Sequence, residues 1–334
     1  MEPTANSRCC SNQISARIRA SPRRAIPAGD SQRRESVEGQ GAPRERGIYN
    51  VSMSPGLQAK QEKLFAILRS MDRVLVAFSG GTDSAYLAWA ANQVLGERAL
   101  AVTADSASIP ESHKRDAEEF VRHFAISHRY IETHEFENPD YIRNDANRCF
   151  HCKDELFTRM EELGTELGIP NIVYGVNLDD TTDFRPGHRA AANHSVRAPL
   201  LEAGMSKPDI RALSKQHDLP TWDRPAAACL SSRIQYGLEV TRENVKLVEA
   251  GEEALRQLGF RVCRVRYHGD LVRIEIGQPE LARALTPEMA ANFTAIFRKL
   301  GFKFVTLDLE GYRLGSFNET LPPGISKHLL PVLS

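Results

Sequence analysis

Hydrophobic positions along residues 57–174 follow two alternating patterns. Segments with apolar residues three or four positions apart predict helices, and short uninterrupted apolar runs predict strands that are buried on both faces. The expected helices are 57–69, 84–95, 112–124 and 154–167, and the expected strands are 74–78, 99–103, 130–131 and 172–174. This βαβ alternation predicts an α/β fold whose parallel sheet carries helices on both faces. Ligands are then expected at the carboxyl ends of the strands.

The pattern changes after Tyr236. A helix over 242–258, strands over 262–267 and 271–276, a helix over 280–299 and a strand over 302–307 predict a smaller α+β domain. Before this change, Ser206 and Asp209 have the spacing of a helix cap. We therefore expect an α/β domain over 56–236 and an α+β domain over 237–330.

The first 55 residues differ in composition from the rest. They are rich in arginine, contain no lysine, and have Tyr49 as their one aromatic residue. Such a segment cannot bury a core, so residues 1–55 are expected to be a disordered tail without function. An organelle transit peptide is the alternative, although its apolar face would be thin. Cys9 and Cys10 lie in this tail and are given no role.

Basic and acidic residues balance over the whole chain, at 43 each. This balance gives no indication of a nucleic-acid or membrane partner, and no apolar run reaches the roughly 20 residues of a membrane-spanning helix. The six cysteines are few and unevenly spaced. They indicate metal binding or catalysis in a reducing compartment rather than a disulfide framework. A cytoplasmic protein is expected, with neither nucleic acid nor membrane as partner.

The sequence SGGTDS follows the expected strand 74–78. It consists of Ser79, Gly80, Gly81, Thr82, Asp83 and Ser84. Successive backbone N–H groups, two glycines and a helix N-terminus there would form a concave site that favours anions such as phosphate. The alternative is an ordinary strand-to-helix turn with a capping side chain. Neither G-x-x-x-x-G-K-[ST] nor G-x-G-x-x-G occurs at this turn, so a nucleotide fold that uses neither motif is favoured.

The same six residues resemble the signature of the PP-loop ATP pyrophosphatases. This resemblance implies that ATP is cleaved between its α and β phosphates, that a substrate oxygen is adenylated, and that the loop holds pyrophosphate. It also implies Mg²⁺, with Asp83 as a candidate ligand. The segment AVTADS ends the second strand where such families hold adenosine, so Asp105 and Ser106 are further candidates for binding ATP. A simple approach to the next helix is the alternative for these two residues.

Three cysteines are candidates for the remaining chemistry. Cys149 and Cys152 form RCFHCK, and Cys229 lies in RPAAACLSSR. Three thiolates on a cubane cluster leave one iron without a protein ligand, and that iron could carry a sulfide for transfer. A structural zinc would need a fourth ligand such as His151. Thiols without any metal are the third alternative. Cys263 alternates with arginines on an expected strand and is interpreted as a buried core thiol.

Further segments resemble the LarE family of ATP-dependent sulfur transferases. They are AVTADS, RCFHCKDELF, GVNLDDTTDFRPG, LPTWDRPAAACLSSRI, CRVRYHGDLVRIEIG and GFKFVTLDLEGYRLGSFNE, and the resemblance runs from about residue 57 to residue 321. It implies conversion of pyridinium-3,5-biscarboxylic acid mononucleotide to the bis-thiocarboxylic acid form, a step in making the nickel-pincer cofactor of lactate racemase. Each carboxylate would be adenylated by ATP before sulfur displaces AMP. An assembly of several identical subunits is also implied.

The family resemblance implies two routes for sulfur. In one branch, the cysteine that matches Cys229 is the sacrificial donor and becomes dehydroalanine. In the other branch, a C-x-x-C pair joins that cysteine to hold a 4Fe-4S cluster, which passes on a bound sulfide. This chain has both Cys149 and Cys152, so it resembles the cluster branch.

The implied substrate is a multiply anionic nucleotide, so cationic groups are expected near Cys229. Arg264 and Arg266 are two apart on a strand and share one face, which makes them candidates for the substrate phosphate. Ser232 and Arg233 follow Cys229 and are candidate helpers. The alternative is that the strand arginines face water.

The segment DDTTDFRPG is expected to line the ligand crevice after a strand end. Its Asp180, Asp183 and Arg185 could bind ATP, Mg²⁺ or substrate, or could only order the loop; these roles stay open.

Three other functions compete with this interpretation. A tRNA thiolase combines a PP-loop with similar cysteines, but after the tail is removed the chain keeps 34 basic and 38 acidic residues, which is not the footprint of an RNA-binding protein. An ammonia-dependent synthetase would give no reason for the three cysteines. A non-enzymatic iron-sulfur carrier would have no use for a pyrophosphate site.

Overall fold

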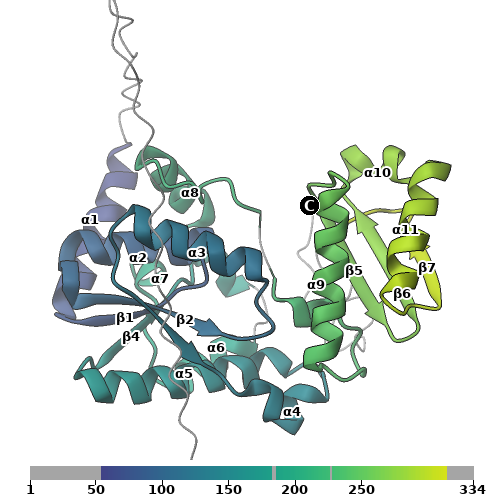
Figure 1. The fold of residues 1–334 in the computed structure, drawn as a ribbon. Helices are drawn as coiled ribbons and strands as arrows, with labels where there is room; N and C mark the ends of the chain where they lie inside the picture. The colour runs from purple at the N-terminus through teal and green to yellow at the C-terminus, as the bar shows by residue number, and fades with distance from the viewer. Residues whose placement is uncertain (1–53, 183–185, 226–227, 314–334) are drawn as a thin grey trace, which may run out of the picture. The chain divides into compact units, whose positions relative to one another are not determined.

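The computed structural model describes residues 54–182, 186–225 and 228–313, which belong to one compact unit (Figure 1). The expected tail with Cys9 and Cys10 lies outside the described residues, as do Asp183 and Arg185. Ser54 and Pro55, at the end of the expected tail, already begin the first helix. The side chain of Ser54 accepts a hydrogen bond from the backbone N–H of Leu57.

A four-stranded parallel sheet forms the first half of the described chain. Its strands are β1 Val74–Ala77, β2 Ala99–Asp105, β3 His128–Glu132 and β4 Asn171–Tyr174, in the order β3-β2-β1-β4. All three strand pairs are parallel, so every strand ends at the same edge. The expected parallel sheet is confirmed, and β1 lies at its centre beside β2 and β4.

Helices cover both faces of this sheet (Figure 1). One face carries α1 Pro55–Ser70, α2 Thr82–Leu95, α3 Glu111–His123, α7 Pro199–Glu202 and α8 Lys207–Gln216, and the other carries α5 Arg148–Leu167 and α6 Pro186–Asn193. Side chains of β1 alternate between the two layers: Val74 and Val76 pack with α2, while Leu75 and Ala77 pack with α5. Every residue of β1 is therefore buried, which explains its uninterrupted apolar sequence.

Short elements connect these layers. They are η1 Gly96–Arg98, η2 Glu135–Glu137, α4 Pro139–Ile142, η3 Leu178–Thr182 and η4 Leu230–Arg233. The expected start of α5 at residue 154 is wrong, because the helix begins at Arg148 and contains both Cys149 and Cys152. The sequence RCFHC shows no helical hydrophobic pattern. Its first turn is instead fixed by hydrogen bonds from the Arg148 side chain.

A smaller mixed sheet follows. Its elements are α9 Arg242–Gln257, β5 Cys263–His268, β6 Leu271–Ile276, α10 Gln278–Ala284, α11 Pro287–Lys299 and β7 Phe304–Leu307. β5 pairs antiparallel with β6, and β6 pairs parallel with β7. The expected α+β fold is confirmed, but the single expected helix 280–299 is wrong. It is broken because Thr286 caps a new helix that has Pro287 in its first turn.

Two local predictions hold in the structure. Ser206 and Asp209 form a reciprocal capping box at the start of α8. Cys263 is 3% exposed and packs in the core of the smaller sheet, which confirms its assignment as a core thiol. That core also includes Phe136 and Tyr141, from the chain between β3 and α5.

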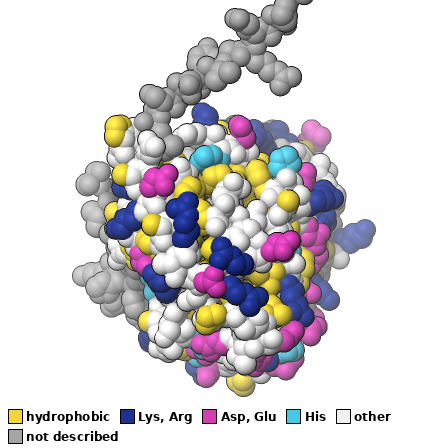
Figure 2. Space-filling model, turned by 90° about the vertical axis from the view of Figure 1, so that its left-hand side faces the viewer, with side chains coloured by type: hydrophobic (Ala, Val, Ile, Leu, Met, Phe, Trp, Pro, Cys, Tyr) yellow, Lys and Arg dark blue, Asp and Glu magenta, His cyan; other side chains and the backbone are white. Residues whose placement is uncertain are grey.

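The surface carries charges of both signs (Figure 2). On the face shown in Figure 2, lysine and arginine side chains are interspersed with aspartate and glutamate, and hydrophobic side chains are visible between them. Among the residues that the structure describes, no helix has the length and apolar character that crossing a membrane requires.

We predict that packing of α9 onto β5 depends on Gly251. A Cβ atom at this position would lie 2.7 Å from Cε1 of Phe297 and 3.2 Å from Cγ2 of Val265. Gly251→Ala should lower the free energy of unfolding by about 1–3 kcal/mol, because the ring and the strand must move apart. Thermal and urea unfolding would measure this loss.

Gly56→Ala is the matched control, because it also replaces a helical glycine and a Cβ there meets nothing within 4 Å. Its stability should be unchanged or slightly higher. Equal stability of the two variants would contradict the packing argument.

Candidate active site

The loop after β1 combines a left-handed glycine with an uncapped helix start. Gly80 has φ +71°, a conformation that favours glycine, and it lies against Ala117 of α3. α2 begins at Thr82, and Gly81 at its N-cap position supplies no side-chain cap. The N-cap residue therefore leaves the backbone N–H groups of the first turn without a capping side chain, and such a helix start favours an anion.

Side-chain hydrogen bonds fix the shape of this loop. The Ser84 hydroxyl accepts a hydrogen bond from the backbone N–H of Ser79 at 3.2 Å and lies 3.1 Å from the Ser79 hydroxyl. Thr82 donates to the carbonyl of Thr221 at 2.8 Å. Arg224 donates to the carbonyl of Gly80 at 2.9 Å and forms an ion pair with Asp116. The segment that precedes Cys229 thus supports the loop.

Gly175, at the end of β4, lies directly against the first turn of α2. A Cβ atom on Gly175 would stand 2.8 Å from the backbone nitrogen of Ser84 and 3.0 Å from the carbonyl carbon of Asp83. Only a residue without a side chain allows this approach. Gly175 was not identified from the sequence.

Asp83 provides an oxygen that lacks a partner. Its Oδ2 forms an ion pair with Nζ of Lys207 at 2.5 Å, while its buried Oδ1 has no hydrogen-bond partner within the described part of the chain. Burial raises the pKa of Asp83, Lys207 opposes that shift, and Asp180 adds to it. An orphaned carboxylate oxygen of this kind fits a hard cation such as Mg²⁺. Lys207 was not identified from the sequence.

The loop after β4 is fixed to the same place. Asp179 accepts a hydrogen bond from the backbone N–H of Lys207 at 2.6 Å, and Asp180 accepts one from the backbone N–H of Asn177 at 3.2 Å. These contacts order the loop. The negative charge of Asp180 raises the pKa of Asp83, so Asp180 lies near the loop after β1. Asp183 and Arg185 lie outside the described residues.

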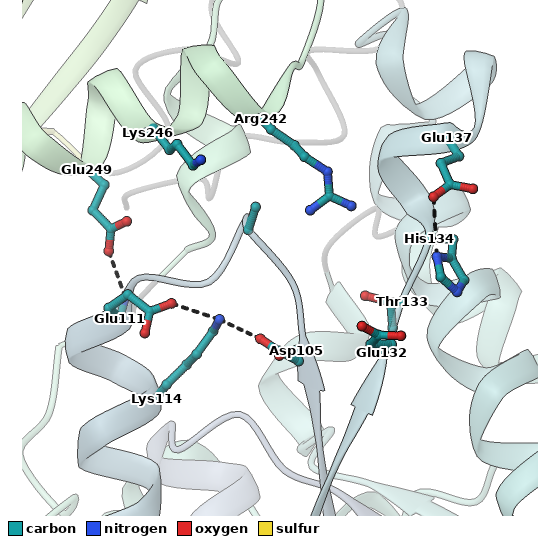
Figure 3. Close-up of a pocket in the computed structure, with 11 residues that line it drawn as sticks. Asp105, Glu111, Lys114, Glu132, Thr133, His134, Glu137, Arg242, Lys246 and Glu249 are labelled. Carbon is teal, nitrogen blue, oxygen red and sulfur yellow. Dashed lines mark hydrogen bonds and ion pairs between the residues drawn. The ribbon is translucent and has the colours of Figure 1, made fainter. Parts of the chain in front are cut away.

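Asp105 and Ser106 lie at the end of β2, but in different surroundings. Asp105 forms an ion pair with Lys114 at 2.6 Å and lines a cavity of about 480 Å³ at the ends of β2 and β3 (Figure 3). The buried Thr133 hydroxyl lines the same cavity without a hydrogen-bond partner among the described residues. Ser106 is buried and is not one of the residues that line this cavity; its hydroxyl contacts the Ser108 hydroxyl and the Glu135 carboxylate.

Charged residues of two elements line this cavity. Arg242 and Lys246 of α9 project from one side, and Asp105 and Glu132 lie on the strand side (Figure 3). Both sides are mixed in charge, because Lys114 pairs with Asp105 on the strand side and Glu249 lies on α9 with Arg242 and Lys246.

The three cysteines are brought into one neighbourhood. Cys149 and Cys152 lie in the first turns of α5, and Cys229 is the N-cap residue of η4. Cys149 is exposed, whereas Cys152 and Cys229 are partly buried. Burial raises the pKa of the Cys152 thiol, and the nearby Glu135 and Cys229 raise it further. Within residues 54–182, 186–225 and 228–313, no three His, Cys, Asp or Glu side chains are arranged to hold a metal ion.

Hydrogen bonds from the α4–α5 region hold the turn after Cys229. Arg148 donates to the carbonyl of Ser231 at 2.9 Å, and the Tyr141 hydroxyl lies 2.7 Å from that of Ser231. Asn144, with φ +58°, donates to the carbonyls of Ile234, Gln235 and Leu238. None of these contacts was predicted, because they join residues about 90 positions apart.

Two buried ion pairs hold the same turn from the smaller sheet. Arg233 pairs with Glu252 at 2.9 Å and donates to the carbonyl of Cys229 at 3.0 Å. Arg266 pairs with Glu275 at 2.8 Å and donates to the carbonyl of Ser232 at 3.2 Å. The Ser232 hydroxyl donates to the carbonyl of Cys229 at 2.7 Å. These three predicted substrate residues thus also build the turn.

Arg264 has a different environment. Its guanidinium lies 4.8 Å from the ring centroid of Tyr312, donates to the carbonyl of Cys263 and has no ion pair with a carboxylate in the described ranges. Burial lowers the pKa of Arg264, and the positive charge of Arg233 lowers it further. An anion placed here would relieve both effects. The alternative that both strand arginines face water is wrong, because Arg266 is 6% exposed and Arg264 is partly buried.

Known proteins resemble this chain over most of its length. It is 33% identical over 267 residues to the pyridinium-3,5-bisthiocarboxylic acid mononucleotide synthase of Lactiplantibacillus plantarum, covering 79% of this chain and 96% of that protein. It is 40% identical over 265 residues to an uncharacterised protein of Synechocystis sp., covering 79% and 99%. An uncharacterised protein of Methanocaldococcus jannaschii is 26% identical over 241 residues, covering 72% and 91%. No family model matches the chain.

We predict that Gly175→Ala weakens ATP binding. The added methyl group must displace the first turn of α2, whose N–H groups are directed to the ligand. A shift of this size at a binding site should weaken the equilibrium affinity for ATP by about 10-fold to 100-fold. Isothermal titration calorimetry would measure it, with Gly56→Ala as the control that leaves affinity unchanged. Unchanged affinity in Gly175→Ala would show that this loop does not hold the nucleotide.

Proposed function

The chain belongs to the LarE family of pyridinium-3,5-bisthiocarboxylic acid mononucleotide synthases, and we propose that it inserts sulfur into a pyridinium mononucleotide at the expense of ATP. The observation that carries this proposal is the connection between two sites. Arg224 holds Gly80 of the anion-binding loop, and Cys229 follows five residues later. Five residues span at most roughly 18 Å, so the sulfur-bearing turn stays close to the nucleotide loop.

Adenylation would take place at the loop after β1. A substrate carboxylate oxygen bonds to the α phosphorus of ATP, the bond to the β phosphate breaks, and pyrophosphate leaves with the electron pair. The N–H groups of residues 80–84 would bind the pyrophosphate, and Lys207 adds a positive charge beside Asp83. Mg²⁺, for which Oδ1 of Asp83 is the proposed ligand, would neutralise phosphate charge when bound.

The cavity at the ends of β2 and β3 supports a place for the adenosine. Asp105 and the unpartnered hydroxyl of Thr133 line it, so ribose hydroxyls and a base would find hydrogen-bond partners there. The loop after β1 and this cavity lie at neighbouring strand ends of one sheet. This is the arrangement that a nucleotide needs to place its phosphates on β1 and its adenosine beside β2.

Arg264 is the proposed partner of the substrate phosphate. It is partly buried and forms no ion pair with a carboxylate of the described residues, whereas Arg233 and Arg266 are already paired with Glu252 and Glu275. The substrate phosphate would supply the missing negative charge. Ser232, Arg233 and Arg266 would act by shaping the turn on which the substrate meets Cys229.

Sulfur transfer would take place at Cys229. The incoming sulfur bonds to the activated carboxyl carbon, and the carbon–oxygen bond to AMP breaks. We propose that Cys149, Cys152 and Cys229 hold a 4Fe-4S cluster, which when bound would offer one iron without a protein ligand for a sulfide. The electrostatic effect of Cys229 and Cys149 on the Cys152 thiol supports this donor set. In a cubane cluster each thiolate binds a different iron. The three sulfur atoms therefore need not surround one metal ion, and the described residues show no such arrangement.

A sacrificial Cys229 is the second route within this proposal. It would lose its sulfur to the substrate and become dehydroalanine. A homo-oligomeric assembly and a cytoplasmic location remain predictions from the sequence. The second candidate function is a tRNA thiolase that uses a cluster-bound sulfur; it is favoured by the three cysteines and disfavoured by the acidic balance of residues 51–334.

We predict that the protein releases AMP when given ATP and the pyridinium biscarboxylate nucleotide, and not when given unmodified tRNA. Chromatographic quantification of AMP would measure both reactions. Arg264→Met should lower kcat/KM for the nucleotide by about 10-fold to 100-fold, because one charge-assisted contact is lost. Arg261→Met on the exposed segment before β5 is the matched control. AMP release with tRNA alone would refute cofactor synthesis in favour of tRNA thiolation.

We predict that anaerobic reconstitution with iron and sulfide gives a brown protein. The absorption should be lost in Cys149→Ala, Cys152→Ala and Cys229→Ala, since each removes one ligand, and kept in the control Cys263→Ala. Mass spectrometry after turnover should find the Cys229 peptide unchanged. A loss of one H₂S from that peptide would instead establish the sacrificial route.

A further inference from the structure

Arg148 is a buried cation whose hydrogen bonds in the structure go to neutral groups. Its side chain is 4% exposed. It donates to Oδ1 of Asn144 and to the carbonyl of Ser231, and its guanidinium lies 5.6 Å from the ring centroid of Tyr236. It has no ion pair with a carboxylate in the described ranges. A buried charge is strongly unfavourable without a compensating one, so an anion is expected nearby.

The groups beside Arg148 that can supply this anion are thiols. Cys149 follows Arg148 in α5, and Cys229 begins the turn whose Ser231 carbonyl accepts a hydrogen bond from Arg148. The buried Glu135 accepts a hydrogen bond from Ser106, and the described residues show no ion pair between it and Arg148. A negatively charged centre held by the neighbouring cysteines would therefore balance the charge of Arg148.

Arg148 also connects the two segments that carry those cysteines. It precedes Cys149 in α5, and its hydrogen bond to Ser231 reaches the turn that begins at Cys229. That bond spans 83 residues of sequence. One side chain thus fixes the position of α5 relative to the Cys229 turn.

We propose that Arg148 is a positioning residue that joins the two halves of the sulfur site and supplies the positive charge that balances its negative charge. The charge-balancing half of this inference rests on the proposed sulfur chemistry, whereas the joining half rests only on the contacts of Arg148. A cluster with three thiolate ligands carries net negative charge, and a fixed cation beside it stabilises the reduced form. Arg148 would make the site easier to reduce and slower to lose iron.

Three variants separate the two contributions. Arg148→Met removes the charge and both hydrogen bonds while keeping a long side chain. Arg148→Lys keeps the charge, but its side chain is shorter, so its ammonium does not reach the position of the Nη1 nitrogen that donates to both Asn144 and Ser231. Arg143→Met is the matched control, because Arg143 is 62% exposed and pairs with Asp140 and Asp145 on the neighbouring helix end.

The first measurement uses metal-free, reduced protein and dibromobimane, a reagent that bridges two nearby thiols. Peptide mass spectrometry would quantify bridges between the Cys149–Cys152 helix and Cys229. Bridging should fall about 10-fold or more in Arg148→Met, fall less in Arg148→Lys and stay unchanged in Arg143→Met. Circular dichroism and thermal melting check that each variant is folded. Equal bridging in folded Arg148→Met and the unsubstituted protein would overturn the joining role.

The second measurement uses protein reconstituted with iron and sulfide. Loss of iron to a chelator should be about 10-fold to 100-fold faster in Arg148→Met, the range found for residues that support metal ligands. The reduction potential should shift downward in Arg148→Met and much less in Arg148→Lys, which a purely structural role would not produce. An unchanged potential in Arg148→Met would overturn the charge-balancing role. If the unsubstituted protein takes up no iron while bridging still depends on Arg148, the cluster proposal fails and the joining role stands.

Discussion

The turn after Cys229 depends on buried arginines that satisfy its backbone carbonyls. Arg233, Arg266 and Arg148 donate to the carbonyls of Cys229, Ser232 and Ser231. The carbonyls of Cys229 and Ser231 also accept hydrogen bonds from the backbone N–H groups of Ser232 and Ile234, and the arginines add charge-assisted bonds of about 1.5–3 kcal/mol each. The arginines come from the turn itself, from β5 and from α5. The cysteine is therefore held in one place by three parts of the chain.

The loop after β1 is built by the same means. Gly80 and Thr82 are held by Arg224 and by the carbonyl of Thr221, which belong to the segment just before Cys229. The nucleotide loop and the sulfur-bearing turn therefore share one short connecting segment. A reaction that adenylates a carboxylate and then replaces its oxygen needs both sites to act on the same atom. The short connection limits how far the turn can lie from the loop.

The sequence pattern predicted the parallel sheet because its central strands are buried on both faces and read as apolar runs, as in Val74–Ala77. It also located the loop 79–84 and the three cysteines, since these depend on local spacing. It missed the start of α5, where hydrogen bonds of Arg148 replace a hydrophobic pattern. It missed Lys207 as the partner of Asp83 because the two are 124 residues apart. Contacts of that range leave no periodic signal in a single sequence.

The predicted substrate arginines differ in a way that only the structure reveals. Arg233 and Arg266 each have a buried carboxylate, so their charges are already balanced within the protein. Arg264 and Arg148 form no ion pair with a carboxylate among the described residues, although Arg264 is partly buried and Arg148 is buried. An unbalanced cation in such a place is stabilised when an anion arrives. In the proposed reaction the anions are the substrate phosphate beside Arg264 and the sulfur centre beside Arg148. Charges balanced within the protein thus build the turn, and those left unbalanced are the proposed places for its ligands.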